Sequence, residues 1–226
     1  MEGMTELVFV YHCIFAHHHS DWTSFHLDYV SANPLDRVDL VRPYGDDGAS
    51  CQYIIYNCGS DDAVIPTMKD RYRTHQQQGF NRIIGLRDIY GTRYFDIYKA
   101  GHRQIEWAKV KAMIADLEKT VSMVDASGVM AIRFSIMEME AWILAMPKLL
   151  GEVFPNLSCE QLSALDPEVA YVHPYDELNA LVSYKKNFGS VEGIFSHITQ
   201  EHLDDLLQSG KCASFVRFYR CLFDEG

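Results

Sequence analysis

The chain has 226 residues, of which 48% are hydrophobic, and its formal net charge is −11 at pH 7. A chain of this length buries enough apolar surface to fold without disulfides, so we interpret the six cysteines, none of which forms a C-x-x-C pair, as reduced thiols. The negative charge argues against a protein that coats nucleic acid. No apolar run approaches the roughly 18 to 20 residues of a membrane span, so we expect a cytoplasmic protein with no membrane partner.

Basic residues gather between Lys69 and Lys111. This segment holds ten of the twenty basic residues and four acidic ones, a local balance of +6 that leaves −17 for the remainder. A solvated helix face is the ordinary reason for such a run, and an anionic ligand near the segment is the functional alternative.

The first predicted elements are a strand, a helix and a second, short strand. Leu7 to Phe15 is an apolar run of strand length, rich in β-branched and aromatic residues. After the polar segment that follows, we predict a helix over Trp22 to Ser31, ended by Asn33-Pro34. Val38 to Val41 is then read as a short strand before the turn-rich GDDG sequence.

The middle of the chain predicts alternating strands and helices. Tyr53 to Tyr56 has the residues of a strand, and Gly59 to Asp62 opens a helix that reaches about Gln78, with Gly79 as its C-terminal signal. A strand over Arg82 to Leu86 follows. The apolar spacing from Ile105 to Val121 then predicts a long amphipathic helix.

The last predicted strand is Val129 to Phe134, and the pattern after it is helical. One helix is predicted over Met137 to Leu150. Later helices open at Ser158, with Gln161 as a capping partner, at Asp166, and at Thr199, the last of them closed by Gly210.

This order predicts an α/β fold. Strands that alternate with helices form βαβ units, and their right-handed crossovers give a mainly parallel sheet with helices on both faces. We assign residues 1–150 to this core and residues 151–226 to a helical layer packed on the same domain.

In open α/β sheets ligands bind beyond the carboxyl ends of the strands, and four predicted strands end in polar residues. The first runs into His12 and then His17, His18 and His19, for which an exposed loop is the ordinary interpretation. The second is followed by Gly59, Ser60, Asp61 and Asp62, which either cap the next helix or, with the glycine allowing close approach, hold a phosphate.

Acidic residues follow the other two strands. Asp88 ends the third, where it is expected either to accept structural hydrogen bonds or to bind Mg²⁺, because a desolvated carboxylate needs a partner. Arg87 points to the opposite face. Glu138 and Glu140 follow the fourth strand, and if the helix has already begun at Met137 they lie about 200° apart, so both cannot reach one ion. They could still do so if one lies on the strand-to-helix turn and the other projects from the first helical turn. The ordinary interpretation is that acids are placed favourably at a helix N-terminus.

Two short motifs resemble the toprim-like group of uncharacterised bacterial proteins. They are RIIGLRDIYG, which contains Asp88, and the later E-x-E-A-W-x-L-A segment that begins at Glu138, within a resemblance over roughly residues 7 to 150. It implies a toprim-like, Rossmann-like fold in which acids bind Mg²⁺ for phosphodiester cleavage or transfer. Asp88 matches the first aspartate of the family motif, Tyr90 stands at the second, and Tyr11 or His12 replaces the first-strand glutamate.

We therefore predict a Mg²⁺-dependent (or Mn²⁺-dependent) phosphoester hydrolase of nuclease type, acting on nucleic acid or a small phosphate ligand. One alternative is a non-catalytic binding or assembly module whose C-terminal helices contact a partner protein or a second copy. Another is a nucleotide or small-phosphate site at Gly59 to Asp62. The predicted site residues are Asp88, Glu138 and Glu140 for catalysis, Asp88, Glu140 and Asp61 for the metal, and Gly59, Ser60, Arg87, Arg93 and Lys99 for phosphate.

Overall fold

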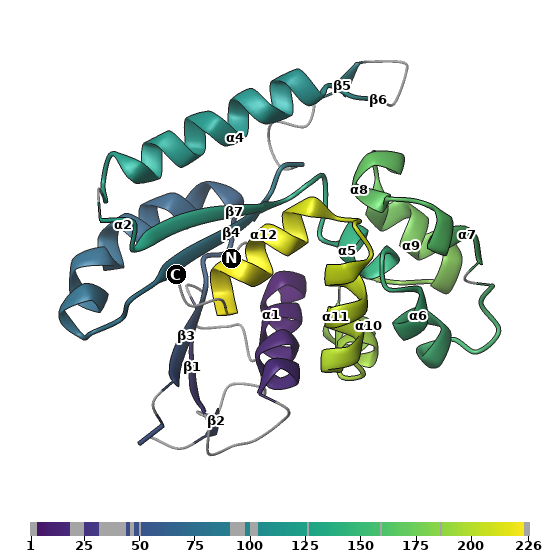
Figure 1. Cartoon of the computed structure of the whole chain (residues 1–226), viewed down its shortest axis with the longest axis horizontal. Helices are drawn as coiled ribbons and strands as arrows, with labels where there is room; N and C mark the ends of the chain where they lie inside the picture. The colour runs from purple at the N-terminus through teal and green to yellow at the C-terminus, as the bar shows by residue number, and fades with distance from the viewer. Residues whose placement is uncertain are drawn as a thin grey trace.

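The computed structural model describes residues 4–18, 25–31, 44–45, 48–49, 51–90, 98–99, 104–125, 127–158, 160–185 and 187–223. It shows a mixed α/β protein (Figure 1). The strands are β1 (Phe25–Ser31), β2 (Tyr44–Gly45), β3 (Cys51–Asn57), β4 (Ile83–Asp88), β5 (Tyr98–Lys99), β6 (Gln104–Ile105) and β7 (Met130–Ser135). The helices of the first two thirds are α1 (Met4–His17), α2 (Asp61–Gln77), α4 (Trp107–Ser122), α5 (Glu140–Leu144) and α6 (Pro147–Val153), and those of the last third are α7 (Glu160–Ala164), α8 (Pro167–Ala170), α9 (Pro174–Val182), α10 (Phe188–Phe195), α11 (Gln200–Gln208) and α12 (Ala213–Phe223).

The described strands form three separate sheets. β1 is central in the first, antiparallel to β2 and parallel to β3. The second is the parallel pair of β4 and β7, and the third is the short antiparallel pair of β5 and β6. The prediction of an α/β protein with parallel strands is therefore confirmed, and β3 and β4, which are joined by α2, belong to different sheets.

The first two predicted elements are wrong. Leu7 to Phe15 lies in helix α1, whose Phe9 is fully buried against the rings of Trp142, Phe195 and Phe215. A helix satisfies its own backbone and can be apolar all round when other helices enclose it, so a continuous apolar run fits either structure. Phe25 to Ser31 is strand β1 rather than the end of a helix.

Strand β1 shows an alternation of buried and partly exposed side chains, a sequence pattern that the predicted helix over Trp22 to Ser31 did not take into account. Phe25 and Leu27 are buried, whereas His26 and Asp28 are partly exposed. Alternation of this kind is typical of a strand with one buried face. The predicted strand over Val38 to Val41 lies outside the described residues.

Several later predicted elements are confirmed, but the single helix predicted over Met137 to Leu150 is wrong. The structure has two short helices there, α5 and α6, because Pro147 lacks the N–H that a continuous helix needs and instead begins α6. The predicted strands at Tyr53, Arg82 and Val129 correspond to β3, β4 and β7, and the two long helices correspond to α2 and α4. Gly79 follows α2 with a φ of +91°, the left-handed conformation that glycine adopts without steric cost. Thr199 caps α11 in a capping box with His202.

Helices cover both faces of the β4–β7 pair. On one face, apolar residues of α2 and α4 pack against β7 in a cluster that includes Val64, Val110 and Ile132. On the other, Leu86 of β4 joins a larger cluster with α1, α5, α10 and α12. The predicted covering of both faces is confirmed for these two strands, which can therefore be apolar on each side.

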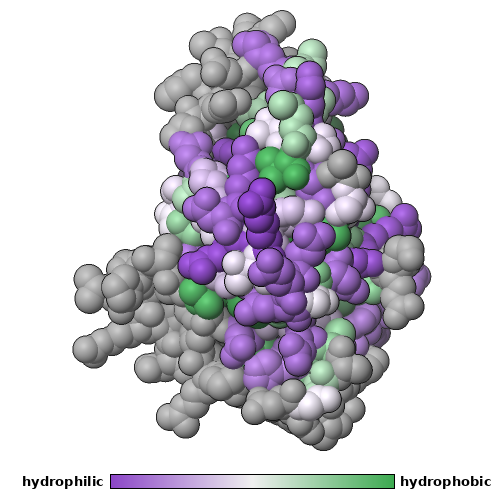
Figure 2. Space-filling model, turned by 90° about the vertical axis from the view of Figure 1, so that its left-hand side faces the viewer, coloured by the Kyte–Doolittle hydropathy of each residue, from purple (hydrophilic) through white to green (hydrophobic). Residues whose placement is uncertain are grey.

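The chain is helical from α5 onward, and its helices share one core with the N-terminal helix. Trp142 of α5 is fully buried against Phe9 of α1 and against Phe215 and Phe218 of α12. In Figure 1, α12 lies beside α1 and close to β4 and β7. Within the described residues, no helix is long and apolar enough to cross a membrane. The left-hand side of the molecule, where α2 lies, is mainly hydrophilic (Figure 2).

Candidate functional site

Four polar residues meet at the carboxyl ends of β4 and β7. The carboxylate of Asp61, the first residue of α2, accepts the backbone N–H of Asp88 at 3.0 Å. Arg87 Nε lies 3.7 Å from the same Asp61 oxygen, and Ser135 Oγ donates to the Asp88 carboxylate. Each of these residues is no more than 7% exposed. Asp61 therefore ties α2 to β4, and a guanidinium lies next to its charge.

The residues that precede α2 have local hydrogen-bonding roles. Ser60 occupies the N-cap position without a side-chain capping bond. Gly59 has a φ of +78°, and its N–H donates to Asn57 Oδ1 at 2.9 Å. Arg87 also lies 4.0 Å from Asp62, which is largely exposed. Ser60 therefore occupies the predicted N-cap position of α2, but its side chain does not form the capping hydrogen bond. Phosphate binding by Gly59 and Ser60 stays a prediction.

The two glutamates after β7 contact other parts of the chain. Glu138 accepts the backbone N–H of Tyr175, in the first turn of α9, at 2.9 Å. Glu140 is buried in α5 beside Tyr184, where burial first and the charge of Glu140 second raise the pKa of the tyrosine. Neither contact involves Asp88. The convergence of Asp88, Glu138 and Glu140 on one site therefore stays a prediction.

Two predicted phosphate ligands and one histidine have no described side chain. Arg93 and His19 lie outside the described residues, and Lys99 belongs to β5 by its backbone alone. Two histidines of the same predicted group contact tyrosines: His17 Nδ1 lies 3.0 Å from Tyr219 Oη, and His18 Nε2 lies 2.9 Å from Tyr53 Oη.

Among the described residues, one group of three potential metal ligands has its ligand atoms within 4.8 Å of one another: Asp166, Glu168 and Cys212. Glu168 accepts Trp142 Nε1–H at 3.0 Å, Ser214 N–H at 3.2 Å and the Ser214 hydroxyl. Asp166 accepts the backbone N–H groups of Glu168 and Cys212. These contacts join α8 to the start of α12.

The hydrogen bonds of this group favour a structural role. Burial raises the pKa of the Cys212 thiol far above its usual range, and Cys212 Sγ donates to the Ala141 carbonyl oxygen at 3.6 Å. Burial also raises the pKa of Glu168, against the opposing effect of its hydrogen bonds to Ser214 and Trp142. Both carboxylate oxygens of Glu168 thus already accept hydrogen bonds from protein donors.

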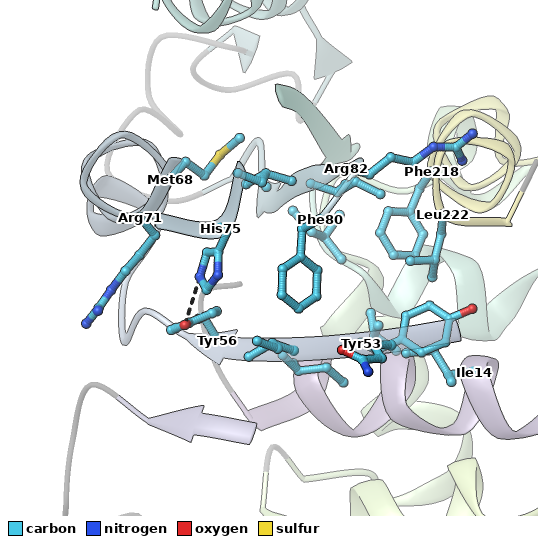
Figure 3. A pocket seen from close by; sticks show the side chains of 18 of the residues that line it. Ile14, Tyr53, Tyr56, Met68, Arg71, His75, Phe80, Arg82, Phe218 and Leu222 are labelled. Carbon is cyan, nitrogen blue, oxygen red and sulfur yellow. Dashed lines mark hydrogen bonds between the residues drawn. The ribbon is translucent and has the colours of Figure 1, made fainter. Parts of the chain in front are cut away.

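A cavity of about 630 Å³ lies between β3 and β4 (Figure 3). Six consecutive residues of each segment line it, Cys51 to Tyr56 and Asn81 to Leu86. Successive side chains of a strand point to opposite faces, so such runs mean that the strands present their edges to the cavity. Residues of α2 close one side, and residues of α1 and α12, among them Ile14, Phe218 and Leu222, close another.

The cavity is basic and aromatic. Its described lining contains five residues with cationic or imidazole side chains and no aspartate or glutamate; they are His17, His18, Arg71, His75 and Arg82. The Arg71 guanidinium carbon lies 5.8 Å from the ring centroid of Tyr56, and Arg82 donates to the Cys221 carbonyl oxygen at 2.9 Å. No motif in the sequence predicts this site, although Arg71 and Arg82 belong to the basic segment between Lys69 and Lys111.

No protein family model matches the chain, and comparisons with curated proteins and with solved structures find no match either. The resemblance to toprim-like proteins therefore stays a prediction.

Proposed function

We propose that this protein binds a small organic anion with an apolar or aromatic body in the cavity between β3 and β4. The observation that carries the proposal is the charge of the described lining, which has two arginines and no acidic residue in a chain of net charge −11. A volume of about 630 Å³ lies within the usual range for small-molecule sites.

Apolar surface on the two strands supports the same proposal. Ile54, Ile83 and Ile84 line the cavity and are only partly buried, although Ile83 and Ile84 also pack against the two hydrophobic clusters. Apolar surface on all three therefore stays open to the cavity. A ligand whose apolar body covers them would gain about 25 cal/mol for each Å² removed from water, and its anionic group would be attracted to Arg71 at the exposed rim.

The test uses three naphthalene compounds of similar shape and different charge. Thermal unfolding is followed with 1-naphthoate, neutral 1-naphthalenemethanol and cationic 1-naphthylmethylamine. The anion is expected to bind most tightly to the basic lining and therefore to raise Tm most. A ligand at a hundred times its Kd adds about 2.7 kcal/mol to the free energy of unfolding. Equal shifts with all three compounds would refute anion selectivity.

Two arginines of α2 provide a matched pair of variants. Arg71 lines the cavity, whereas Arg73 is exposed on the same helix and does not. Both Arg71→Gln and Arg73→Gln remove one positive charge. We expect Arg71→Gln alone to abolish the shift given by 1-naphthoate. Loss of the shift in both variants would mean that net charge rather than the cavity attracts the anion.

A second proposal is metal-dependent phosphoester hydrolysis at the carboxyl ends of β4 and β7, with Mg²⁺ or Mn²⁺ on Asp88 and Asp61 and with Glu138 or Glu140 assisting. Two buried carboxylates beside one buried guanidinium support it, because a divalent ion would offset the remaining negative charge. Calorimetric titration with MgCl₂ and MnCl₂ tests it. Binding by Asp88→Asn that equals binding by the unmodified protein would exclude Asp88 as a ligand.

The two proposals differ in what they require of the sheet. A single toprim-like or Rossmann-like sheet would have β3 and β4 paired, and such pairing would close the cavity that binds the anion. Engineered cysteines at Ile54 and Ile84 separate the two cases, because a disulfide needs Cα atoms less than about 7 Å apart. Rapid disulfide formation in the double variant would favour the single sheet.

A further inference from the structure

Three side chains in the wall of the cavity form a continuous hydrogen-bonded chain. Tyr56 Oη lies 2.9 Å from His75 Nε2, and His75 Nδ1 lies 2.9 Å from Gln78 Oε1. Tyr56 comes from β3, His75 from the last turn of α2, and Gln78 is the residue that ends the helix. Figure 3 shows His75 pointing from α2 toward Tyr56, with Phe80 beside it.

The direction of these hydrogen bonds follows from the groups involved. A carbonyl oxygen can only accept, so Gln78 Oε1 places a proton on Nδ1 of the neutral imidazole. The lone pair of the ring then lies on Nε2 and accepts the hydroxyl proton of Tyr56. A hydroxyl, a base and a group that orients the base are the three parts of an activated nucleophile.

The surroundings suit a hydroxyl that loses its proton only during reaction. Burial raises the pKa of Tyr56, the charge of Arg71 lowers it, and the charge of Asp28 raises it again. Tyr56 therefore holds its proton at neutral pH, and His75 must remove it as the oxygen attacks. The Arg71 guanidinium over the Tyr56 ring adds a positive charge next to the developing negative charge.

A second tyrosine and histidine in the same cavity provide an internal comparison. Tyr53 Oη lies 2.9 Å from His18 Nε2, but Cys51 Sγ also donates to this oxygen, at 3.4 Å. Burial raises the pKa of Tyr53 far above its usual range. Tyr53 therefore has a poorer environment for attack than Tyr56, although both line the same cavity.

We propose that Tyr56 is a nucleophilic hydroxyl activated by His75 and oriented through Gln78, and that its substrates are activated esters with an anionic group. The Tyr56 oxygen forms a bond to the ester carbonyl carbon, the ester C–O bond breaks, and the phenolic proton passes through His75 to the leaving alkoxide. Water then hydrolyses the acyl-tyrosine, with His75 taking the proton of the water and returning it to Tyr56. The inference rests on the proposed function in placing the substrate in the cavity.

The test uses 4-(fluorosulfonyl)benzoate, which joins an anionic group and an aromatic body to one electrophilic sulfur. Tyr56 would form an O–S bond, fluoride would leave, and His75 would take the proton, giving a stable sulfonate ester located by peptide mass spectrometry. Of the 13 tyrosines, Tyr56 is expected to react fastest, and at least about tenfold faster than Tyr53, because Cys51 Sγ donates to the Tyr53 oxygen and burial raises the pKa of Tyr53 far above its usual range.

Variants of the base and its orienting group identify the mechanism. His75→Gln is expected to slow labelling of Tyr56 at least about tenfold, whereas His197→Gln, at an exposed histidine that does not line the cavity, leaves it unchanged. Gln78 is exposed, so its replacement does not endanger the fold. Gln78→Leu is expected to slow labelling, and Gln78→Glu to restore it, since a carboxylate also accepts from Nδ1; a purely structural glutamine would not distinguish these two variants by labelling rate.

Two outcomes overturn the inference. One is labelling of Tyr56 no faster than that of Tyr53, and the other is equal labelling rates in the unmodified protein, His75→Gln and Gln78→Leu. Thermal shift with unreactive 4-sulfamoylbenzoate separates this result from the proposed function. Binding of that analogue without labelling of Tyr56 refutes the nucleophile alone, whereas labelling of Tyr56 that 1-naphthoate does not slow refutes the anion site alone.

Discussion

Replacement of Glu168 tests whether the group it forms with Asp166 and Cys212 is structural. Its carboxylate accepts hydrogen bonds from Trp142 Nε1, Ser214 N and Ser214 Oγ, and it is 3% exposed. In Glu168→Ala the Ser214 N–H stays buried without this acceptor, at roughly 1 to 3 kcal/mol, whereas Trp142 Nε1–H still donates to Ser214 Oγ at 2.9 Å. Relief of the desolvated charge offsets part of the loss, so we expect a net cost of about 2 kcal/mol.

The direction of the Glu168 pKa shift determines how the free energy of unfolding changes with pH. Burial raises this pKa above its ordinary value of 4.5, so folding favours the protonated carboxyl. The contribution to the free energy of unfolding is present in full below the unfolded pKa and is lost as pH rises through the folded value. Glu168→Gln keeps one carbonyl acceptor and cannot ionise, so it should cost about 1 to 2 kcal/mol and lack this decline.

Urea unfolding at several pH values measures both the cost of each Glu168 variant and its pH dependence. The control is Glu118→Ala, on the exposed face of α4, whose free energy of unfolding should lie within about 0.5 kcal/mol of that of the unmodified protein. A cost below about 1 kcal/mol for Glu168→Ala would refute the hydrogen-bonding argument. Identical pH profiles for the unmodified protein and Glu168→Gln would refute the assigned shift. Stabilisation by ZnCl₂ that disappears in Glu168→Gln would favour a metal site instead.

Three further variants test other contacts. Gly85→Ala would bring its Cβ against Met68 Sδ and within 2.9 Å of Val64 Cγ1, so it should lower the free energy of unfolding by about 1 to 3 kcal/mol. Adding Met68→Ala removes the clash with Met68, so the double variant should cost less than the sum of the two single variants, and additive costs would contradict direct contact. For Asp125, burial raises the pKa, but hydrogen bonds from Ser127, Met130 and Tyr72 prevail and lower it to about 2. Its stabilisation is present above the ordinary pKa of 3.8 and is lost as pH falls toward 2, so Asp125→Asn should flatten acid unfolding followed by circular dichroism, and an unchanged acid limb would exclude this role. Thr199→Ala should cost about 1 kcal/mol in urea unfolding by removing the cap of α11, and no cost would mean that the helix end is satisfied without it.

Local sequence signals were sufficient to predict a helix or strand where its own residues and their near neighbours fix its conformation. Gly79 marks the end of α2, and the spacing of apolar residues from Ile105 to Val121 marks α4. Both signals act within a few residues, through backbone conformation and helical period. The segment from Leu7 to Phe15 carries no such signal, because an apolar run fits a strand and an enclosed helix equally well.

The candidate sites also divide into features that the sequence predicts and contacts that only the fold creates. The sequence located Asp61 and Asp88 next to strand ends, and the fold joins them by a hydrogen bond. It could not give Glu138 its contact with Tyr175, which is 37 residues away. The aromatic and basic cavity was also beyond reach, because the separation of β3 from β4 depends on which strands pair with which.

The sequence by itself determined an α/β protein with a net charge of −11 and most of the elements from β3 to β7. Tertiary structure alone decided that α1 is a helix, that β3 and β4 lie in different sheets, and that Tyr56 meets His75 across the cavity between them. The physical reason is that periodicity and capping act between neighbours in the chain, whereas the burial of Phe9 and the edges of the strands are set by residues far away in sequence.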